Sequence, residues 1–141
     1  MCNMKCITNG LVAGIVAGVF FAVFLFKAGM LTTLGSIIHM PTLTGGLIVH
    51  AIVSLISGVL FALILGWLIH SWVAAIVLGL LVGLLMWSIG PMTLLPYLAT
   101  GAPLFSKWSL VSMQNNIPPL IGHLVYGLIL AVTFYALNKK V

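Results

Sequence analysis

Four long apolar stretches dominate this sequence, and each is long enough to cross a lipid bilayer as a helix. They cover about residues 9–28, 46–69, 72–90 and 118–137. A membrane-spanning helix needs roughly 20 consecutive apolar residues. The 141 residues include no aspartate or glutamate, and only 4% are charged, which is far too few for a soluble surface. The sequence therefore predicts an all-α integral membrane protein, a four-helix bundle in contact with the lipid bilayer.

The few charges exclude several classes of function. The formal net charge of +5 comes from scattered lysines, which do not form the basic patch that a nucleic acid requires. The lack of carboxylates excludes hydrolysis by a carboxylate pair and an oxygen cage for calcium or magnesium. The remaining histidines, cysteines, tyrosines and lysines show no pairing of a nucleophile with a base. We therefore expect a protein that is not an enzyme.

The positions of the lysines predict an orientation in the membrane. Lys5, Lys139 and Lys140 flank the termini, whereas Lys27 and Lys107 lie at the opposite ends of the predicted spans. Cytoplasmic flanks carry the excess of positive charge in membrane proteins. We therefore expect both termini in the cytoplasm and the two long connections on the outer side.

The connections between the spans are of two kinds. The second and third spans are joined only by His70 and Ser71, which predicts a tight hairpin. The other two connections, about 29–45 and 91–117, are longer, apolar and rich in proline. Irregular backbone is not tolerated in contact with lipid, so these segments are expected to be interfacial or partly re-entrant and buried against protein. Four tryptophans close to span ends are typical of interfacial anchors: Trp67, Trp72, Trp87 and Trp108.

The two halves of the chain resemble each other. The stretch LVAGIVAG of the first span aligns with WVAAIVLG of the third, and His50 of the second span then corresponds to His123 of the fourth. This pattern predicts a duplicated two-helix unit. Because each unit has an even number of spans, both units have the same orientation, with a pseudo-two-fold axis along the membrane normal. The chain is thus a single transmembrane domain (1–141), with repeats at about 9–70 and 72–137.

Small residues recur at every fourth position in the spans, which is the GxxxG pattern of closely packed membrane helices. Lipid provides no hydrophobic drive for helix association, so close backbone contact has to supply the attraction, and small side chains permit it. The positions predicted to pack in this way are Gly10, Gly14, Gly18, Ala22, Gly46, Gly58, Ala75, Gly79, Gly83, Gly127 and Ala131.

The two histidines at equivalent positions are the main candidates for a site. His50 and His123 each lie about five residues inside a span, and polar residues at membrane depth are often functional. In one interpretation each imidazole forms a hydrogen bond that sets helix register, with Ser54 and Tyr126 as partners. In the other, the imidazoles form a symmetric pair that binds haem, copper or a quinone.

A weaker metal hypothesis rests on residue types alone. Thioether, thiolate and imidazole groups together suit Cu(I), but none of their spacings here is a known metal signature. The two cysteines near the start do not amount to a disulfide framework. The residues of this hypothesis are His50, His123, His39, Met40, Cys2 and Cys6.

Two stretches carry a resemblance to a known group of proteins. GLVAGIVAG at 10–18 and PPLIGHLVYGLIL at 118–130 resemble segments of small prokaryotic membrane proteins of the YagU type. The resemblance implies an integral protein of the inner membrane and implies no activity.

The sequence as a whole favours a non-enzymatic multi-pass protein. It would be a structural or accessory subunit, or a small channel-like or transporter-like protein, and would assemble with copies of itself or in a larger membrane complex. The alternative is a membrane module for haem, copper or quinone.

Overall fold

The computed structural model describes residues 2–139, which contain helices and no β-strand. Four of the helices are long and apolar enough to cross a membrane, which confirms the predicted all-α class and the four spans. They are α1 (Met4–Lys27), α3 (Leu43–Leu65, continued by the 3₁₀ turn η2, Gly66–Leu68), α4 (Trp72–Ile89) and α7 (Ile117–Asn138). The shorter elements are α2 (Leu31–Gly35), η1 (Ser36–Ile38), η3 (Gly90–Leu94), α5 (Leu95–Thr100) and α6 (Leu110–Asn115).

The starts of the long helices follow from local sequence signals. The side chains of Asn3, Thr42 and Ser71 each accept a hydrogen bond from a backbone N–H in the first turn of α1, α3 and α4. Such N-caps satisfy donors that have no partner within the helix. Helix α7 instead begins with prolines in its first turn, where a missing N–H costs nothing. Because of its cap, α1 starts at Met4, about five residues before the predicted span.

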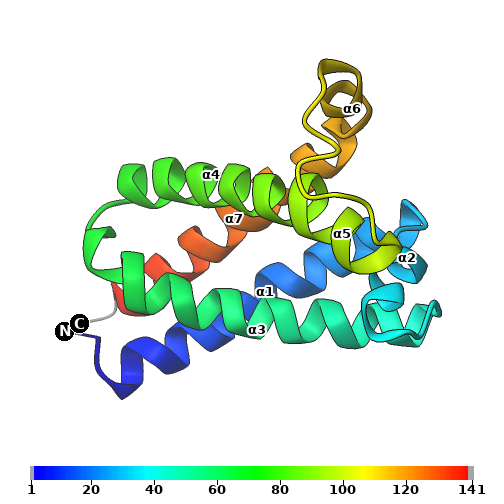
Figure 1. Cartoon of the computed structure of the whole chain (residues 1–141). Helices are drawn as coiled ribbons and strands as arrows, with labels where there is room; N and C mark the ends of the chain where they lie inside the picture. Colours follow the sequence, from blue (N-terminus) through cyan, green and yellow to red (C-terminus); the bar gives the residue numbers. More distant parts are fainter. Residues whose placement is uncertain (1, 140–141) are drawn as a thin grey trace.

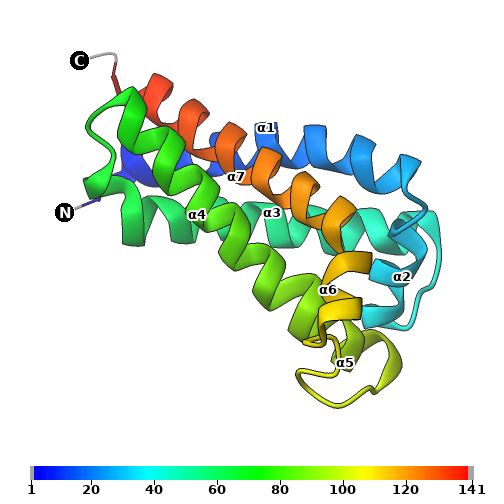
Figure 2. The same cartoon turned by 90° about the horizontal axis from the view of Figure 1, so that it is seen from above.

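The long helices run between two ends of the molecule (Figure 1). The start of α1, the end of α7 and the hairpin between α3 and α4 lie at one end. The short helices α2, α5 and α6 lie at the other end, as the second view also shows (Figure 2). The hairpin holds His70, which is exposed. The two long connections thus meet at one end, where α5 contacts both α2 and η1.

The third span continues beyond its predicted end at residue 90. Helix α4 passes into η3, a π-helical turn, and then into α5, so the helical path reaches Thr100. Pro91 lies in this turn, and a proline within a regular α-helix removes one hydrogen bond and clashes with the preceding turn. The wider turn accommodates it, because the N–H of Leu95 bonds to the carbonyl of Gly90, five residues earlier.

Several of the glycines predicted to pack lie close to the backbone of a neighbouring helix. Helix α1 packs on α3, and α4 packs on α7. A Cβ added to Gly10 would lie 2.6 Å from the Gly58 carbonyl oxygen, and one added to Gly79 would lie 2.6 Å from the Gly127 carbonyl oxygen. Gly46 is an exception to the pairing of spans, because its close neighbour is the backbone of Leu31 in α2.

Helix α1 also packs on α7 and so joins the two pairs. Phe21, Leu130 and Phe134 belong to one buried core that both helices share. Near the termini, the side-chain amide of Asn9 donates to that of Asn138, at 3.1 Å. No comparably extensive contact joins α3 to α4 among residues 2–139, and a cavity lies between these two helices.

Candidate functional site: a cavity lined by two histidines

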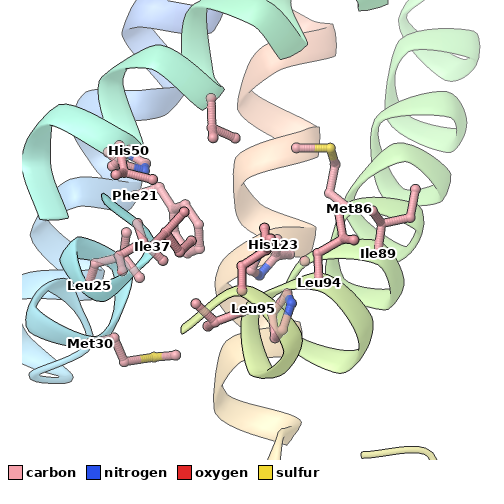
Figure 3. A pocket seen from close by; sticks show the side chains of 16 residues that line it. Phe21, Leu25, Met30, Ile37, His50, Met86, Ile89, Leu94, Leu95 and His123 are labelled. Atoms are coloured by element: carbon pink, nitrogen blue, oxygen red, sulfur yellow. The ribbon is translucent and has the colours of Figure 1, made fainter. Parts of the chain in front are cut away.

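A cavity of about 230 Å³ lies between α3 and α4, with α1 and α7 behind it and the short helices at one end. Among the described residues that line it, His50 and His123 are the only ones with polar side chains, and the rest are aliphatic, aromatic, methionine, proline or glycine. Figure 3 shows His50 on the α3 side of this space, His123 on α7, and Met86 on the far wall from α4. The structure therefore places both candidate histidines in one cavity.

His50 is held by a neighbouring helix. Its Nε2–H donates to the carbonyl oxygen of Gly18 in α1, at 2.8 Å, and the hydroxyl of Ser54 lies 3.5 Å from the same nitrogen. The side chain is only 7% exposed. Because a carbonyl oxygen can only accept, the proton is on Nε2, and Nδ1 carries the lone pair in the neutral ring.

His123 is held by its own helix. Its Nδ1–H donates to the carbonyl oxygen of Pro119, one turn earlier in α7, at 2.7 Å. By the same reasoning Nε2 carries the lone pair in the neutral ring. A Cβ added to Gly90 would lie 3.9 Å from this Nε2, so the nitrogen points toward the π-helical turn at the wall of the cavity.

Phe21 of α1 contacts both imidazoles. Its ring centroid lies 5.6 Å from that of His50 and 4.7 Å from that of His123, with both pairs edge-to-face. This arrangement is favourable for aromatic rings. Phe21 and the two backbone carbonyls together fix the orientation of both histidines without any carboxylate.

The predicted partners Ser54 and Tyr126 form a polar cluster between α3 and α7. The hydroxyl of Ser57 donates to the Ser54 carbonyl at 3.1 Å, and the Tyr126 hydroxyl bonds to the Ser57 hydroxyl. The Tyr126 hydroxyl also lies 3.5 Å from the Ser54 carbonyl oxygen. Tyr126 is therefore bonded to serine groups of α3, and Ser54 alone approaches an imidazole, that of His50.

The mouth of the cavity is surrounded by outward-facing apolar side chains. Val53 of α3, Ile89 of α4, Leu94 of η3 and Leu98 of α5 line the cavity and are between 42% and 48% exposed. The bottom of the cavity is more enclosed, where Val49 and His50 are buried. The opening thus lies on the side of the molecule, among residues that resemble the rest of the apolar outer surface.

Of the residues of the weaker metal hypothesis, only His50 and His123 line the cavity between α3 and α4. Cys2 and Cys6 form a disulfide with each other, a bond that the sequence analysis did not anticipate and that leaves no thiolate there for a metal. His39 and Met40 lie just before α3, at the opposite end of the molecule from the disulfide. Within residues 2–139 no group of three or more histidine, cysteine or acidic side chains is placed to hold a metal ion.

One tryptophan departs from its prediction as an interfacial anchor. Trp87 is only 6% exposed, and its Nε1–H donates to the carbonyl of Asn116, at 3.0 Å. It connects α4 to the start of α7, whereas Trp67, Trp72 and Trp108 are exposed.

Sequence reasoning also missed two residues that shape the cavity, Phe21 and Gly90. The signal for Gly90 was the adjacent proline, which marked a break in regular helix.

Comparison with known proteins adds no further identification, since no protein-family model, curated protein or solved structure matches this chain.

Proposed function

We propose that this chain is a non-enzymatic four-span membrane protein that binds a small apolar molecule taken from the bilayer. The observation that carries the proposal is the apolar cavity between α3 and α4 that both histidines line. Small-molecule sites are typically concave and mostly apolar, with a few polar groups that orient the ligand. Its opening among exposed aliphatic side chains favours entry from lipid over entry from water. Such a protein acts as an accessory binding subunit or as a small transporter-like unit.

A hydrolytic role is disfavoured by the protonation of His50. The pair Ser54–His50 superficially resembles a nucleophile and a base, at 3.5 Å. However, the nitrogen that faces the serine already carries the proton that it donates to Gly18. That nitrogen has no lone pair with which to accept the serine proton, as a general base must.

The size and chemistry of the cavity discriminate among the cofactors of the alternative hypothesis. A porphyrin is larger than a drug-sized ligand, whereas this cavity, about 230 Å³, is below the roughly 300–1,000 Å³ typical for such ligands. Copper requires a group of ligands, and Phe21 occupies the space against both imidazoles. By size alone, a single ring such as that of a quinone or hydroquinone fits the cavity better than haem does.

We further propose that the chain arose by duplication of a two-helix unit. Alignment of the halves pairs Gly18 with Gly79 and Ser54 with Gly127. In the structure Gly18 lies against Ser54, and Gly79 lies against Gly127. Equivalent residues therefore make equivalent contacts in the two pairs, which supports a common origin. The contact between α1 and α7 has no equally close counterpart between α4 and α3, and the cavity occupies that place.

For location, we propose the inner membrane of a prokaryote with both termini in the cytoplasm, as the lysines and the resemblance to YagU-type proteins suggest. Lys5 lies in the first turn of α1 and Lys139 follows α7, at the same end of the molecule. Lys27 ends α1 at the other end, toward which Lys107 also lies. Assembly with further copies or with a larger complex belongs to this proposal.

The test is binding of naphthalene, measured by equilibrium dialysis against empty micelles of the same detergent. Val53→Trp fills the mouth of the cavity, and Ile52→Trp adds the same bulk next to it on the outer surface, where Ile52 is 51% exposed. We expect the parent chain and Ile52→Trp to bind about one naphthalene per cavity, and Val53→Trp to bind at least about tenfold more weakly. Equal binding by Val53→Trp, or no binding above that of empty micelles, would refute the proposal.

A further inference from the structure

We infer that the ligand of this cavity is an apolar molecule that carries a hydroxyl group and donates its hydrogen bond to Nε2 of His123. The inference rests on the proposed function, because it names the class of molecule that the cavity takes. The observation behind it is that the side chains lining the cavity offer hydrogen-bond acceptors and no donor.

Each imidazole uses its single N–H on a backbone carbonyl. His50 donates from Nε2 to Gly18, and His123 donates from Nδ1 to Pro119. A neutral imidazole has one donor and one acceptor nitrogen, so both rings have only an acceptor left to offer. In metal sites, a hydrogen bond from one ring nitrogen to a carbonyl likewise orients the histidine that binds through its other nitrogen.

The acceptor of His123 is open to the cavity. Within residues 2–139, every buried side-chain nitrogen or oxygen has a hydrogen-bond partner. Nε2 of His123 has none within this part of the chain, so Nε2 is not a buried atom. Nε2 is therefore not sealed by protein. His123 lines the cavity and its Nε2 lies near Gly90, so a ligand in the cavity can approach this nitrogen (Figure 3).

Gly90 keeps this nitrogen accessible. A Cβ there would already be at van der Waals distance from Nε2, at 3.9 Å, so glycine leaves the space beside the nitrogen unfilled. The π-helical turn that begins at Gly90 brings the backbone to this position, and such turns are frequent at functional sites. The site thus combines an oriented acceptor, a gap beside it and apolar walls.

The chemistry of the ligand follows from these features. A ketone or quinone carbonyl is itself only an acceptor, so neither neutral imidazole can bond to it. A hydroxyl group can donate to Nε2 while the apolar part of the molecule fills the remaining space. Phenols, hydroquinones and cyclic alcohols share this chemistry.

The experiment compares three ligands of nearly the same shape by the same dialysis: naphthalene, 1-naphthol and 1-methoxynaphthalene. Each affinity is corrected by the partition of the compound into empty micelles. We expect 1-naphthol to bind about tenfold more tightly than 1-methoxynaphthalene, the ratio that corresponds to one net hydrogen bond of about 1.4 kcal/mol. In His123→Phe the ratio of the 1-naphthol affinity to the 1-methoxynaphthalene affinity should fall to about one, and this ratio is the readout whatever the change in the affinity for naphthalene. His70→Phe, in the exposed hairpin, is the matched control and should keep the preference.

A second measurement uses the unmodified chain and does not depend on the folding of a variant. With ¹⁵N-labelled histidine, 1-naphthol should shift the signal of one unprotonated ring nitrogen, and 1-methoxynaphthalene should leave it unchanged. Decahydro-1-naphthol, the saturated analogue, distinguishes an aliphatic alcohol from a phenol as the preferred source of the hydroxyl. If naphthalene binds but 1-naphthol shows no preference and no shift, this inference is overturned and the proposed function stands. If none of the compounds binds, both are overturned.

Discussion

Substitution of Gly79 tests whether the bundle depends on backbone contact between its helices. A Cβ at this position would lie 2.6 Å from the Gly127 carbonyl oxygen and 3.0 Å from the Ala131 Cβ. Real Cβ atoms essentially never approach other heavy atoms closer than 3.0 Å. The obstacle is backbone, which cannot rotate away as a side chain can. Gly79→Ala therefore forces α4 and α7 apart by several tenths of an ångström.

The cost can be estimated from known effects of overpacking. Adding methyl or methylene groups to a well-packed interior typically costs about 1–3 kcal/mol. We expect Gly79→Ala to lower the free energy of unfolding by about 2 kcal/mol, within that range. Gly79→Leu introduces three further carbon atoms at the same contact and should lower it more. The neighbouring contact of Gly83 with the His123 backbone is disturbed by the same displacement.

The control is Leu81→Ala, on the same helix. Leu81 is 56% exposed and faces outward, so its truncation should change stability by less than about 0.5 kcal/mol. The three variants and the parent chain are unfolded by heat in one detergent, with helical circular dichroism and monodispersity followed in parallel. If Gly79→Leu is as stable as Leu81→Ala, the glycine face does not hold the helices together and the packing explanation is wrong.

Three further outcomes follow from the same contacts. Gly18→Ala should be destabilising because the new methyl meets the Ser54 side chain, and Ser54→Gly should restore stability in the double variant; no recovery would show that another neighbour is responsible. Lys107→Cys should react with an impermeant maleimide added outside intact cells, whereas the parent chain should not, because its two cysteines lie at the N-terminal end, on the proposed cytoplasmic side; reaction only after permeabilisation would reverse the proposed topology. His50→Asn should reduce thermal stability more than His123→Asn, because only the former histidine bonds to another helix. Without ligand the two losses should add within about 0.5 kcal/mol, and a larger coupling in a double-mutant cycle would indicate a shared proton or ligand.

The number, class and approximate limits of the spans could be predicted from the sequence, because they depend on local properties. A stretch of about 20 apolar residues without a carboxylate has few alternatives to a membrane helix. The hairpin before Trp72 followed from the short polar interruption at His70 and Ser71. The end of the third span was not predictable in the same way, because Pro91 is accommodated by a π-helical turn, whose formation depends on what packs around it.

For the candidate site, the sequence alone singled out His50 and His123 as polar residues at equivalent depth. It did not determine which nitrogen of each ring is free, because that depends on carbonyl groups brought near by the fold, one from α1 and one from α7 itself. It also did not reveal the cavity or the contact of Phe21 with both imidazoles. These features arise where helices distant in the chain meet or fail to meet. Apolar periodicity indicates that a helix face is buried. Only the tertiary structure decides which helices that face packs against and where a cavity remains between them.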